Sequence, residues 1–262
     1  MKSKNLNLFG RMKRCLSGSN RFRIALPLLL ALGGVGPTSA QVASTTNSTV
    51  RIAGIVLKWV RGDKETNWRR LEPMVREAAK GGARIVVTTE YFLDGYAIQD
   101  KNIPLEEYRA LGEPTPDGKY FQRLESLAGE LRIHLVAGMT EAEGELRYNA
   151  SVLIGPDGRL LGKYQKHALE HELVRNTPGT NTPSFKTDFG RLGMMICADR
   201  KHPDLVGRIV AGGVEFLICP SGSMFGPKTN DHFLQERSRE NSVQSCSCIL
   251  ASFWRPDRTG RS

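Results

Sequence analysis

Three residues of this chain have the types and positions needed for acyl-transfer chemistry, namely Cys197, Lys166 and Glu90. Cys197 follows the run Leu192–Ile196, in which residues alternate with the two-residue period of a buried strand. Glu90 and Lys166 end two further apolar runs. Open α/β sheets usually bind their ligands at the carboxyl edge, so these three residues are expected to meet there.

Each of the three residues has a chemical task at such an edge. A cysteine is only a few per cent thiolate at neutral pH, so the Glu90 carboxylate would help by taking its proton. Lys166 is a fixed cation that would stabilise the oxyanion formed when sulfur attacks a carbonyl or nitrile carbon. The backbone N–H of Ala198 would supply a second donor. The pattern therefore predicts nucleophilic catalysis by Cys197.

A fourth residue, Glu172, follows Lys166 by six positions and is expected to hold its ammonium group, because a buried ammonium needs a partner. Two carboxylates on either side of one lysine would push the pKa of one of them upward, towards that of a proton shuttle. Glu170 is the second choice for this position.

Two other interpretations of the cysteine compete with this one. A free cysteine at the end of an apolar strand is more often a small core residue, so Cys197 alone is weak evidence. A papain-like site would instead use His167, His171 or His202 as the base. No cysteine-protease signature surrounds these histidines, so the glutamate–lysine–cysteine interpretation is favoured.

The segments that must position these residues alternate between strand and helix patterns. Pro203 and Asp204 suit the first turn of a helix directly after the cysteine segment. Helices are predicted over 64–81, 120–131, 203–211 and 231–243. Strands are predicted over 50–59, 84–90, 133–139, 150–154, 160–166, 192–197, 214–220 and 248–254. Such alternation predicts an α/β fold with helices outside the sheets.

The basic charge of the chain is concentrated at its start. The formal net charge is +10, but seven basic residues and no acidic ones lie within residues 1–40, and the remainder carries only +3. The apolar run Ile24–Leu32 and the small residues before Gln41 complete the pattern of a secretory signal peptide. We therefore expect a signal peptide at 1–40, a linker at 41–49, and export to a periplasm or the extracellular space.

Composition also argues against several classes of partner. The apolar run is far shorter than the ~20 residues of a membrane span, so no stable membrane insertion is expected after signal cleavage. No basic run interleaved with aromatic residues predicts nucleic-acid binding. Four cysteines follow residue 40, without CxxC or His/Cys spacing, so we expect buried thiols and no metal site.

Several sequence blocks together resemble one known family. Glu90 in "TTEYFLDGY", Lys166 in "GKYQKHAL" and Cys197 in "GMMICADRKHP" are similar to the three signature blocks of the carbon–nitrogen hydrolase (nitrilase-like) superfamily. "RYNAS" at 147–151 and "RSREN" at 237–241 resemble its flanking motifs. The resemblance implies an αββα sandwich of two mixed sheets with helices on the outer faces. It also implies a Glu–Lys–Cys triad, a thioester intermediate, no cofactor and a homo-oligomer, with Glu172 as the second glutamate.

The residues after the cysteine point to one branch of this family. Nitrile-cleaving members tend to have tryptophan and glutamate directly after the cysteine, whereas this chain has Ala198 and Asp199. The block is closer to amidases and N-carbamoyl-amino-acid hydrolases, so an amide or ureido substrate and ammonia release are expected, with a nitrile as the lesser alternative. The expected substrate-binding residues are Tyr91, Asn149, His171, Ala198, Asp199 and Arg200, and Arg200 would meet a substrate carboxylate or pair with a structural acid.

The C-terminal part departs from the resemblance. Family members usually continue past the "RSREN" helix and its strand, whereas this sequence stops at Ser262, so the domain at 50–262 is expected to be short of edge strands. The alternative function is therefore a non-catalytic homologue or fragment that acts as a binding subunit.

Overall fold

The computed structural model describes residues 50–222 and 226–249. The predicted signal peptide, the linker at 41–49 and the segment after Ile249 lie outside the described residues. The strands are β1 (Ile52–Ile55), β2 (Ile85–Thr88), β3 (Glu113–Pro114), β4 (His134–Glu143), β5 (Leu146–Ile154), β6 (Leu160–Gln165), β7 (Ser184–Thr187), β8 (Gly190–Met194), β9 (Phe216–Ser221) and β10 (Gln244–Ile249). The α-helices are α1 (Lys64–Lys80), α2 (Leu105–Ala110), α3 (Lys119–Leu131), α4 (Pro203–Val210) and α5 (Gly226–Asn241), and the short 3₁₀ helices are η1 (Ala97–Gln99), η2 (Glu170–Val174) and η3 (Cys197–Lys201).

Within the described residues, the strands form two mixed sheets. The first has the order β1-β2-β4-β5-β6, with β3 paired to β4, and the second has the order β10-β9-β8-β7. Strands β1, β2 and β4 are mutually parallel, as are β8, β9 and β10, while β5, β6 and β7 pair antiparallel to their neighbours. Glu90 follows the carboxyl end of β2, and Cys197 follows the carboxyl end of β8.

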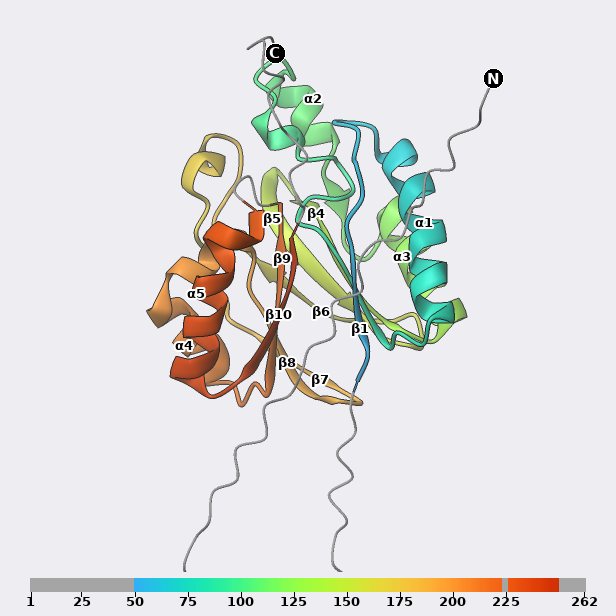
Figure 1. Cartoon of the computed structure of the whole chain (residues 1–262). Coiled ribbons are helices and arrows are strands. Elements are labelled where there is room, and N and C mark those ends of the chain that lie inside the picture. The colour runs from blue at the N-terminus through green and yellow to red at the C-terminus, as the bar shows by residue number, and fades with distance from the viewer. Residues whose placement is uncertain (1–49, 223–225, 250–262) are drawn as a thin grey trace, which may run out of the picture. The chain divides into compact units, whose positions relative to one another are not determined.

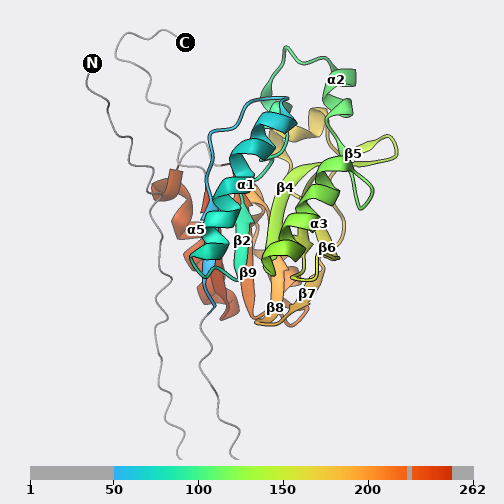
Figure 2. The same ribbon diagram turned by 90° about the vertical axis from the view of Figure 1, so that its right-hand side faces the viewer.

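The two sheets pack face to face between helices (Figures 1 and 2). On β2, Val86 packs with the apolar residues of α1 and α3, whereas Ile85 and Val87 pack against residues of β8, β9 and α4. This division follows from the alternation of side chains along a strand. Helices α4 and α5 lie on the other side of the second sheet (Figure 1). The α/β fold that the pattern predicts and the αββα sandwich that the resemblance implies are both confirmed.

Local sequence signals explain where the principal helices begin. Asp63 caps α1, because its carboxylate accepts a hydrogen bond from the Thr66 N–H at 2.9 Å. Pro203 occupies the first turn of α4, as the sequence predicts. Amphipathic spacing places Trp68, Leu71 and Val75 of α1 in the core.

Some predicted boundaries are wrong. The strand before Cys197 ends at Met194, so the cysteine begins the tight turn η3 rather than ending a strand. Helix α5 starts at Gly226 instead of near Asp231. The last strand spans Gln244–Ile249, and most of the predicted run 248–254 lies outside the described residues. Strand β7 and helix α2 are too short to show a clear period in the sequence.

In the part of the chain that the structure describes, every helix is too short or too polar to cross a membrane.

Candidate active site

The turn after β2 places the first acidic residue. Glu90 follows the strand by two positions, and Tyr91 next to it has a left-handed backbone with a φ of 52°. Gly138 of β4 allows this turn to approach closely, because a Cβ atom there would lie 2.5 Å from the carbonyl oxygen of Thr89. The chain therefore turns sharply and directs the Glu90 side chain into the interior, where it is fully buried.

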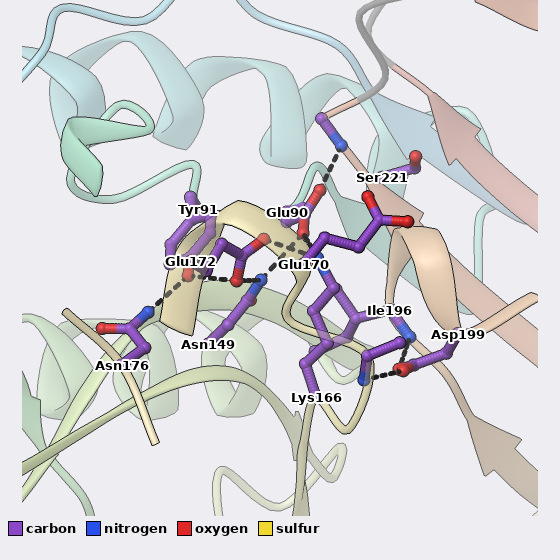
Figure 3. A network of polar contacts seen from close by, with 12 residues as sticks. Glu90, Tyr91, Asn149, Lys166, Glu170, Glu172, Asn176, Ile196, Asp199 and Ser221 are labelled. Carbon is purple, nitrogen blue, oxygen red and sulfur yellow. Dashed lines mark hydrogen bonds and ion pairs between the residues drawn. The ribbon is translucent and has the colours of Figure 1, made fainter. Parts of the chain in front are cut away.

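Lys166 and Glu172 come from the segment that follows β6. The Lys166 ammonium lies 2.9 Å from Oε1 of Glu90 and 2.6 Å from Oε1 of Glu172, and all three side chains are buried (Figure 3). Asn149 of β5 bridges the two carboxylates, because its Nδ2 donates to Glu90 Oε1 at 2.8 Å and to Glu172 Oε2 at 3.0 Å. One lysine and one amide thus hold both acids in a fixed arrangement.

Burial and mutual charge give the two carboxylates different acidities. Burial disfavours the charge on Glu90, but Lys166 and the hydrogen bonds from Gly222 and Asn149 outweigh it and lower the pKa of Glu90. Burial and the Glu90 charge raise the pKa of Glu172 to about 7. The expectation that one of two carboxylates around a lysine has a raised pKa is confirmed. Lys166 stays protonated, since Glu90 and Glu172 raise its pKa despite its burial.

Cys197 stands at the first position of η3 with a φ of 46°, a left-handed conformation that only a firmly held turn maintains in a non-glycine residue. Asp199 holds this turn. Its Oδ2 accepts from the Ile196 N–H at 2.9 Å and from the Tyr164 hydroxyl at 2.8 Å. Its Oδ1 accepts from the Ala168 N–H at 2.8 Å, so the same carboxylate also ties η3 to the loop that follows Lys166.

The environment of the thiol favours its neutral form. Burial and the negative charge of Glu90 raise the pKa of Cys197 to about 12, while Lys166, Arg200 and a hydrogen bond with Ser221 act in the opposite direction. The charges of Glu90 and Lys166 therefore act directly on this cysteine. At neutral pH the site combines a thiol, an ionised Glu90 and an ammonium group, so the thiol needs a base before it can act as a nucleophile.

The residues expected to bind substrate differ in what they contact. The Tyr91 hydroxyl donates to Glu172 at 2.8 Å, and Asn149 bridges the acids as described above. Both carboxylate oxygens of Asp199 accept hydrogen bonds from protein donors. These contacts indicate that Asp199 holds the turn rather than binding substrate. Ala198 is buried in η3, and His171 is exposed, with Gln99 3.5 Å from its ring.

Arg200 does not face an open surface. Its side chain is buried, and Nη1 donates to the Ser221 hydroxyl at 3.1 Å. The side-chain hydrogen bonds that the described residues give Arg200 go to Ser221 and Cys219, so the predicted ion pair with a structural acid gains no support. Arg200 instead reaches Cys197 through Ser221, the residue that ends β9.

The alternatives considered for the acid and base residues lie elsewhere. Glu170, the second choice for the acid that holds Lys166, forms an exposed ion pair with Lys201 at 3.0 Å. His167 Nε2 donates to the Asn181 carbonyl oxygen at 2.9 Å, and with His202 this residue lines a surface cavity of about 330 Å³ beside α4. The strongest charge effects on Cys197 come from Glu90, Lys166 and Arg200, so a histidine base gains no support.

Several site residues had no signal in the sequence. Ser221, Tyr96 and the Gly222 N–H contact the cysteine or Glu90. Asn176 and Tyr108 continue the hydrogen bonds from Tyr91. Apart from Tyr96, which is six positions from Glu90, these residues have partners distant in the chain, so no local spacing predicts them. Within the described residues, no group of three or more His, Cys, Asp or Glu side chains is arranged to hold a metal ion.

The sequence of residues 49–248 matches the family described as carbon-nitrogen hydrolase, and the chain belongs to that family. It is similar to the bifunctional nitrilase/nitrile hydratase NIT4A of Lupinus angustifolius, with 31% identity over 204 residues that cover 71% of this chain and 58% of the relative. It is also similar to a nitrilase of Pyrococcus abyssi, with 30% identity over 185 residues that cover 69% of this chain and 67% of the relative. The chain thus spans little more than half of the plant enzyme's length.

Solved structures show the same fold. Saccharomyces cerevisiae Nit3, a member of branch 10 of the nitrilase superfamily, superposes with a TM-score of 0.69 and 25% identity, covering 79% of this chain and 77% of that one. An amidase of Nesterenkonia sp. AN1 superposes with a TM-score of 0.67 and 23% identity, covering 79% of each chain.

Proposed function

We propose that this protein is a cysteine-dependent hydrolase that cleaves the non-peptide carbon–nitrogen bond of a small amide or N-carbamoyl compound. The observation that carries the proposal is the buried contact of Lys166 with both Glu90 and Glu172, within electrostatic reach of the Cys197 thiol. Buried charges are expensive unless they are paired, so such a cluster is typical of a functional site.

The first half of the reaction uses the thiol and Glu90. As the Cys197 sulfur attacks the carbonyl carbon, Glu90 accepts the thiol proton, because its lowered pKa keeps it ionised. The carbonyl oxygen becomes an oxyanion, which the Lys166 ammonium stabilises. The carbon–nitrogen bond then breaks, the proton on Glu90 passes to the leaving nitrogen, and a thioester remains on Cys197.

The second half reverses these roles with water. Glu90 takes a proton from a water molecule that attacks the thioester carbon, and Lys166 again stabilises the oxyanion. The carbon–sulfur bond breaks, the proton returns to the thiolate, and the acid leaves. Glu172 stays bound to the ammonium of Lys166 throughout and holds it in place.

Two features support an amide or ureido substrate over a nitrile. The turn that presents Cys197 is fitted to the short side chain of Asp199, where nitrile-cleaving members tend to have glutamate. Amides and ureido groups also carry N–H donors, which a nitrile lacks. The buried Oδ1 of Asn149 is an acceptor without a hydrogen-bond partner among the described residues, while its Nδ2 is bound to both acids.

The test is ammonia release by the purified full chain from a panel of aliphatic amides, N-carbamoyl amino acids and nitriles. We expect turnover of at least one amide or N-carbamoyl compound, none by Cys197→Ala, and retained turnover by Cys246→Ala. A folded wild type that is inert to the whole panel would contradict the proposal and favour a non-catalytic binding subunit.

Nitrile hydrolysis is the second candidate function, because both curated relatives described above are named nitrilases. The same panel separates the two candidates. Turnover restricted to nitriles, with the carboxylic acid and ammonia as products, would replace the amidase assignment by a nitrilase assignment while leaving the role of Cys197 unchanged.

We also propose that the protein is exported and acts as a homo-oligomer. The proposal of export rests on the basic and apolar pattern of residues 1–40. Fusion of this segment to a reporter that is active only after export tests it, and light scattering of the purified chain tests the oligomeric state. A reporter that stays in the cytoplasm, or a monomer at micromolar concentration, would contradict the respective proposal.

A further inference from the structure

A continuous series of buried hydrogen bonds leads away from Glu172, on the side opposite Lys166. The Tyr91 hydroxyl lies 2.8 Å from Glu172 Oε2, and Asn176 Nδ2 lies 2.6 Å from the Tyr91 hydroxyl (Figure 3). The Tyr108 hydroxyl in turn lies 2.7 Å from Asn176 Oδ1. These side chains are all at least nine-tenths buried, so water does not compete for their hydrogen bonds.

The chemistry of the amide gives this series a direction. An amide oxygen only accepts hydrogen bonds and an amide nitrogen only donates them. Asn176 therefore accepts a hydrogen bond from the Tyr108 hydroxyl and donates one to the Tyr91 oxygen. The Tyr91 oxygen is then occupied as an acceptor by Asn176. Its single hydroxyl proton therefore points to Glu172, and the carboxylate receives a donor rather than facing another acceptor.

The contacts at the far end of the series agree with this direction. Thr140 of β4 donates its hydroxyl proton to the buried Asp94 carboxylate. The Thr140 oxygen lies 3.4 Å from the Tyr108 hydroxyl, so Thr140 has no second proton to offer Tyr108. The Tyr108 proton goes to the nearer acceptor, Asn176 Oδ1 at 2.7 Å. The Thr140–Asp94 hydrogen bond therefore agrees with the order Tyr108, Asn176, Tyr91, Glu172, because it leaves Tyr108 without a competing donor.

We propose that Tyr108 and Asn176 are positioning residues that orient the Tyr91 hydroxyl as a permanent donor to Glu172 and so keep this carboxylate the acceptor that holds Lys166. The inference rests on the proposed function, in which Lys166 stabilises the oxyanion. We call the hydrogen bonds from Tyr108 through Asn176 to Tyr91 the relay. Without the relay, the Tyr91 hydroxyl is free to rotate its proton away from Glu172. The protonated form of Glu172 then becomes more favourable, because a neutral acid donates a hydrogen bond where an ionised one only accepts.

The relay acts together with the other groups that face Glu172. Lys166 follows β6, Asn149 lies on β5, and Glu90 comes from the turn after β2. Lys166 and Asn149 donate to Glu172 and favour its ionised form, whereas burial and the Glu90 charge favour the protonated form. Because these influences are opposed, the loss of one well-directed donor is expected to change the ionisation of Glu172 measurably.

The experiment is a pH titration of the full chain labelled with carbon-13 at the glutamate carboxyl groups, followed by NMR. The Glu172 resonance is identified by its absence in Glu172→Gln. We expect Tyr108→Phe and Asn176→Leu each to raise the pKa of Glu172 by about one unit, and Tyr91→Phe by at least as much. Tyr164→Phe is the matched control, since it removes an equally buried hydroxyl that donates to Asp199 instead.

An unchanged pKa of Glu172 in folded Tyr108→Phe and Asn176→Leu would overturn the proposal, as would an equal shift in Tyr164→Phe. Circular dichroism verifies the fold, and Tyr108→Phe alone decides the matter should Asn176→Leu not fold, since it removes a single oxygen. The titration requires no turnover. An active enzyme without the shift would refute only the relay, and an inactive enzyme with the shift would refute only the proposed function.

Discussion

Lys166 and Glu172 are six residues apart in the chain, and their charged atoms lie 2.6 Å apart in a site that excludes water from both side chains. The same ammonium reaches Glu90 at 2.9 Å. A single cation thus serves two carboxylates, and only Glu90 is fully ionised at neutral pH, since Glu172 has a pKa of about 7. This unequal pair leaves Glu90 as the base for Cys197.

The first prediction concerns Glu90→Gln, which removes the base without changing the size of the side chain. Turnover should fall by about 10²–10⁴-fold. The thiol pKa should fall at the same time, because the Glu90 charge contributes to raising it to about 12. Alkylation by iodoacetamide, measured across pH on the tryptic peptide that contains Cys197, checks the second effect. A profile that is unchanged or moved to higher pH would refute the assignment of this charge.

The second prediction concerns Lys166→Met, which leaves two buried carboxylates without their cation. Such uncompensated charge should lower the free energy of unfolding by about 3–5 kcal/mol. Adding Glu172→Gln to this variant should restore part of the loss. Arg76→Met is the control, because Arg76 pairs with Glu72 and Glu130 on the surface, where ion pairs contribute at most about 1 kcal/mol. Equal losses in urea denaturation of the two single variants would contradict the burial argument.

The third prediction concerns Asp199→Asn. A side chain with one oxygen cannot accept from both the Ile196 and Ala168 N–H groups and from Tyr164, so at least one buried donor loses its partner. Stability should fall by about 1–3 kcal/mol. Displacement of Cys197 should reduce kcat/KM by about 10²-fold. Tyr164→Phe should cost less in both measurements, because both N–H groups keep their acceptor. If Tyr164→Phe is as damaging as Asp199→Asn, the carboxylate does not organise the turn.

The fourth prediction concerns stability and pH. The ordinary pKa of a glutamate is 4.5, and that of folded Glu172 is about 7. Between these values the folded chain keeps a proton that the unfolded chain has lost, so the free energy of unfolding falls as pH rises, by up to about 3 kcal/mol. Burial raises the pKa of Asp94 to about 6 and adds a contribution of the same sign. Denaturant unfolding at several pH values should show a smaller slope for Glu172→Gln than for wild type.

Glu170→Gln is the control for this slope, because Glu170 is exposed and its pKa is lowered by Lys201. The slope of this variant should stay close to that of wild type over the same pH range. A Glu172→Gln variant with the full wild-type slope would show that Glu172 does not titrate in this range.

The chemistry of the site was largely predictable from sequence because its charged members follow apolar strands. Glu90 and Lys166 come after β2 and β6, and a strand pattern of period two can be recognised without knowing the fold. The raised pKa of one carboxylate could be anticipated as well, since it needs only two acids near one cation. The identity of that acid, Glu172, followed from the need to pair a buried ammonium and from the family resemblance, and not from periodicity.

The support around the site could not be predicted in the same way. Tyr108 and Asn176 are 68 residues apart, and Tyr91 and Asn176 are 85 apart, so no local spacing links them. Asp199 illustrates the same difficulty. Its position after the cysteine suggested a substrate contact, but the tight turn η3 directs its carboxylate back to backbone N–H groups. The apolar alternation predicts a strand that continues to Cys197, so no pattern in the sequence indicates that η3 begins at this residue.

The most direct test of the account is the mass of the protein during turnover. The chain is mixed with the best amide or N-carbamoyl substrate, quenched in acid and digested with trypsin. We predict that the peptide Leu192–Arg200 gains the mass of the acyl group in wild type and that Cys197→Ala shows neither the adduct nor turnover. Turnover that persists in Cys197→Ala, or an adduct found on another residue, would contradict the central claim that the Cys197 sulfur captures the acyl carbon.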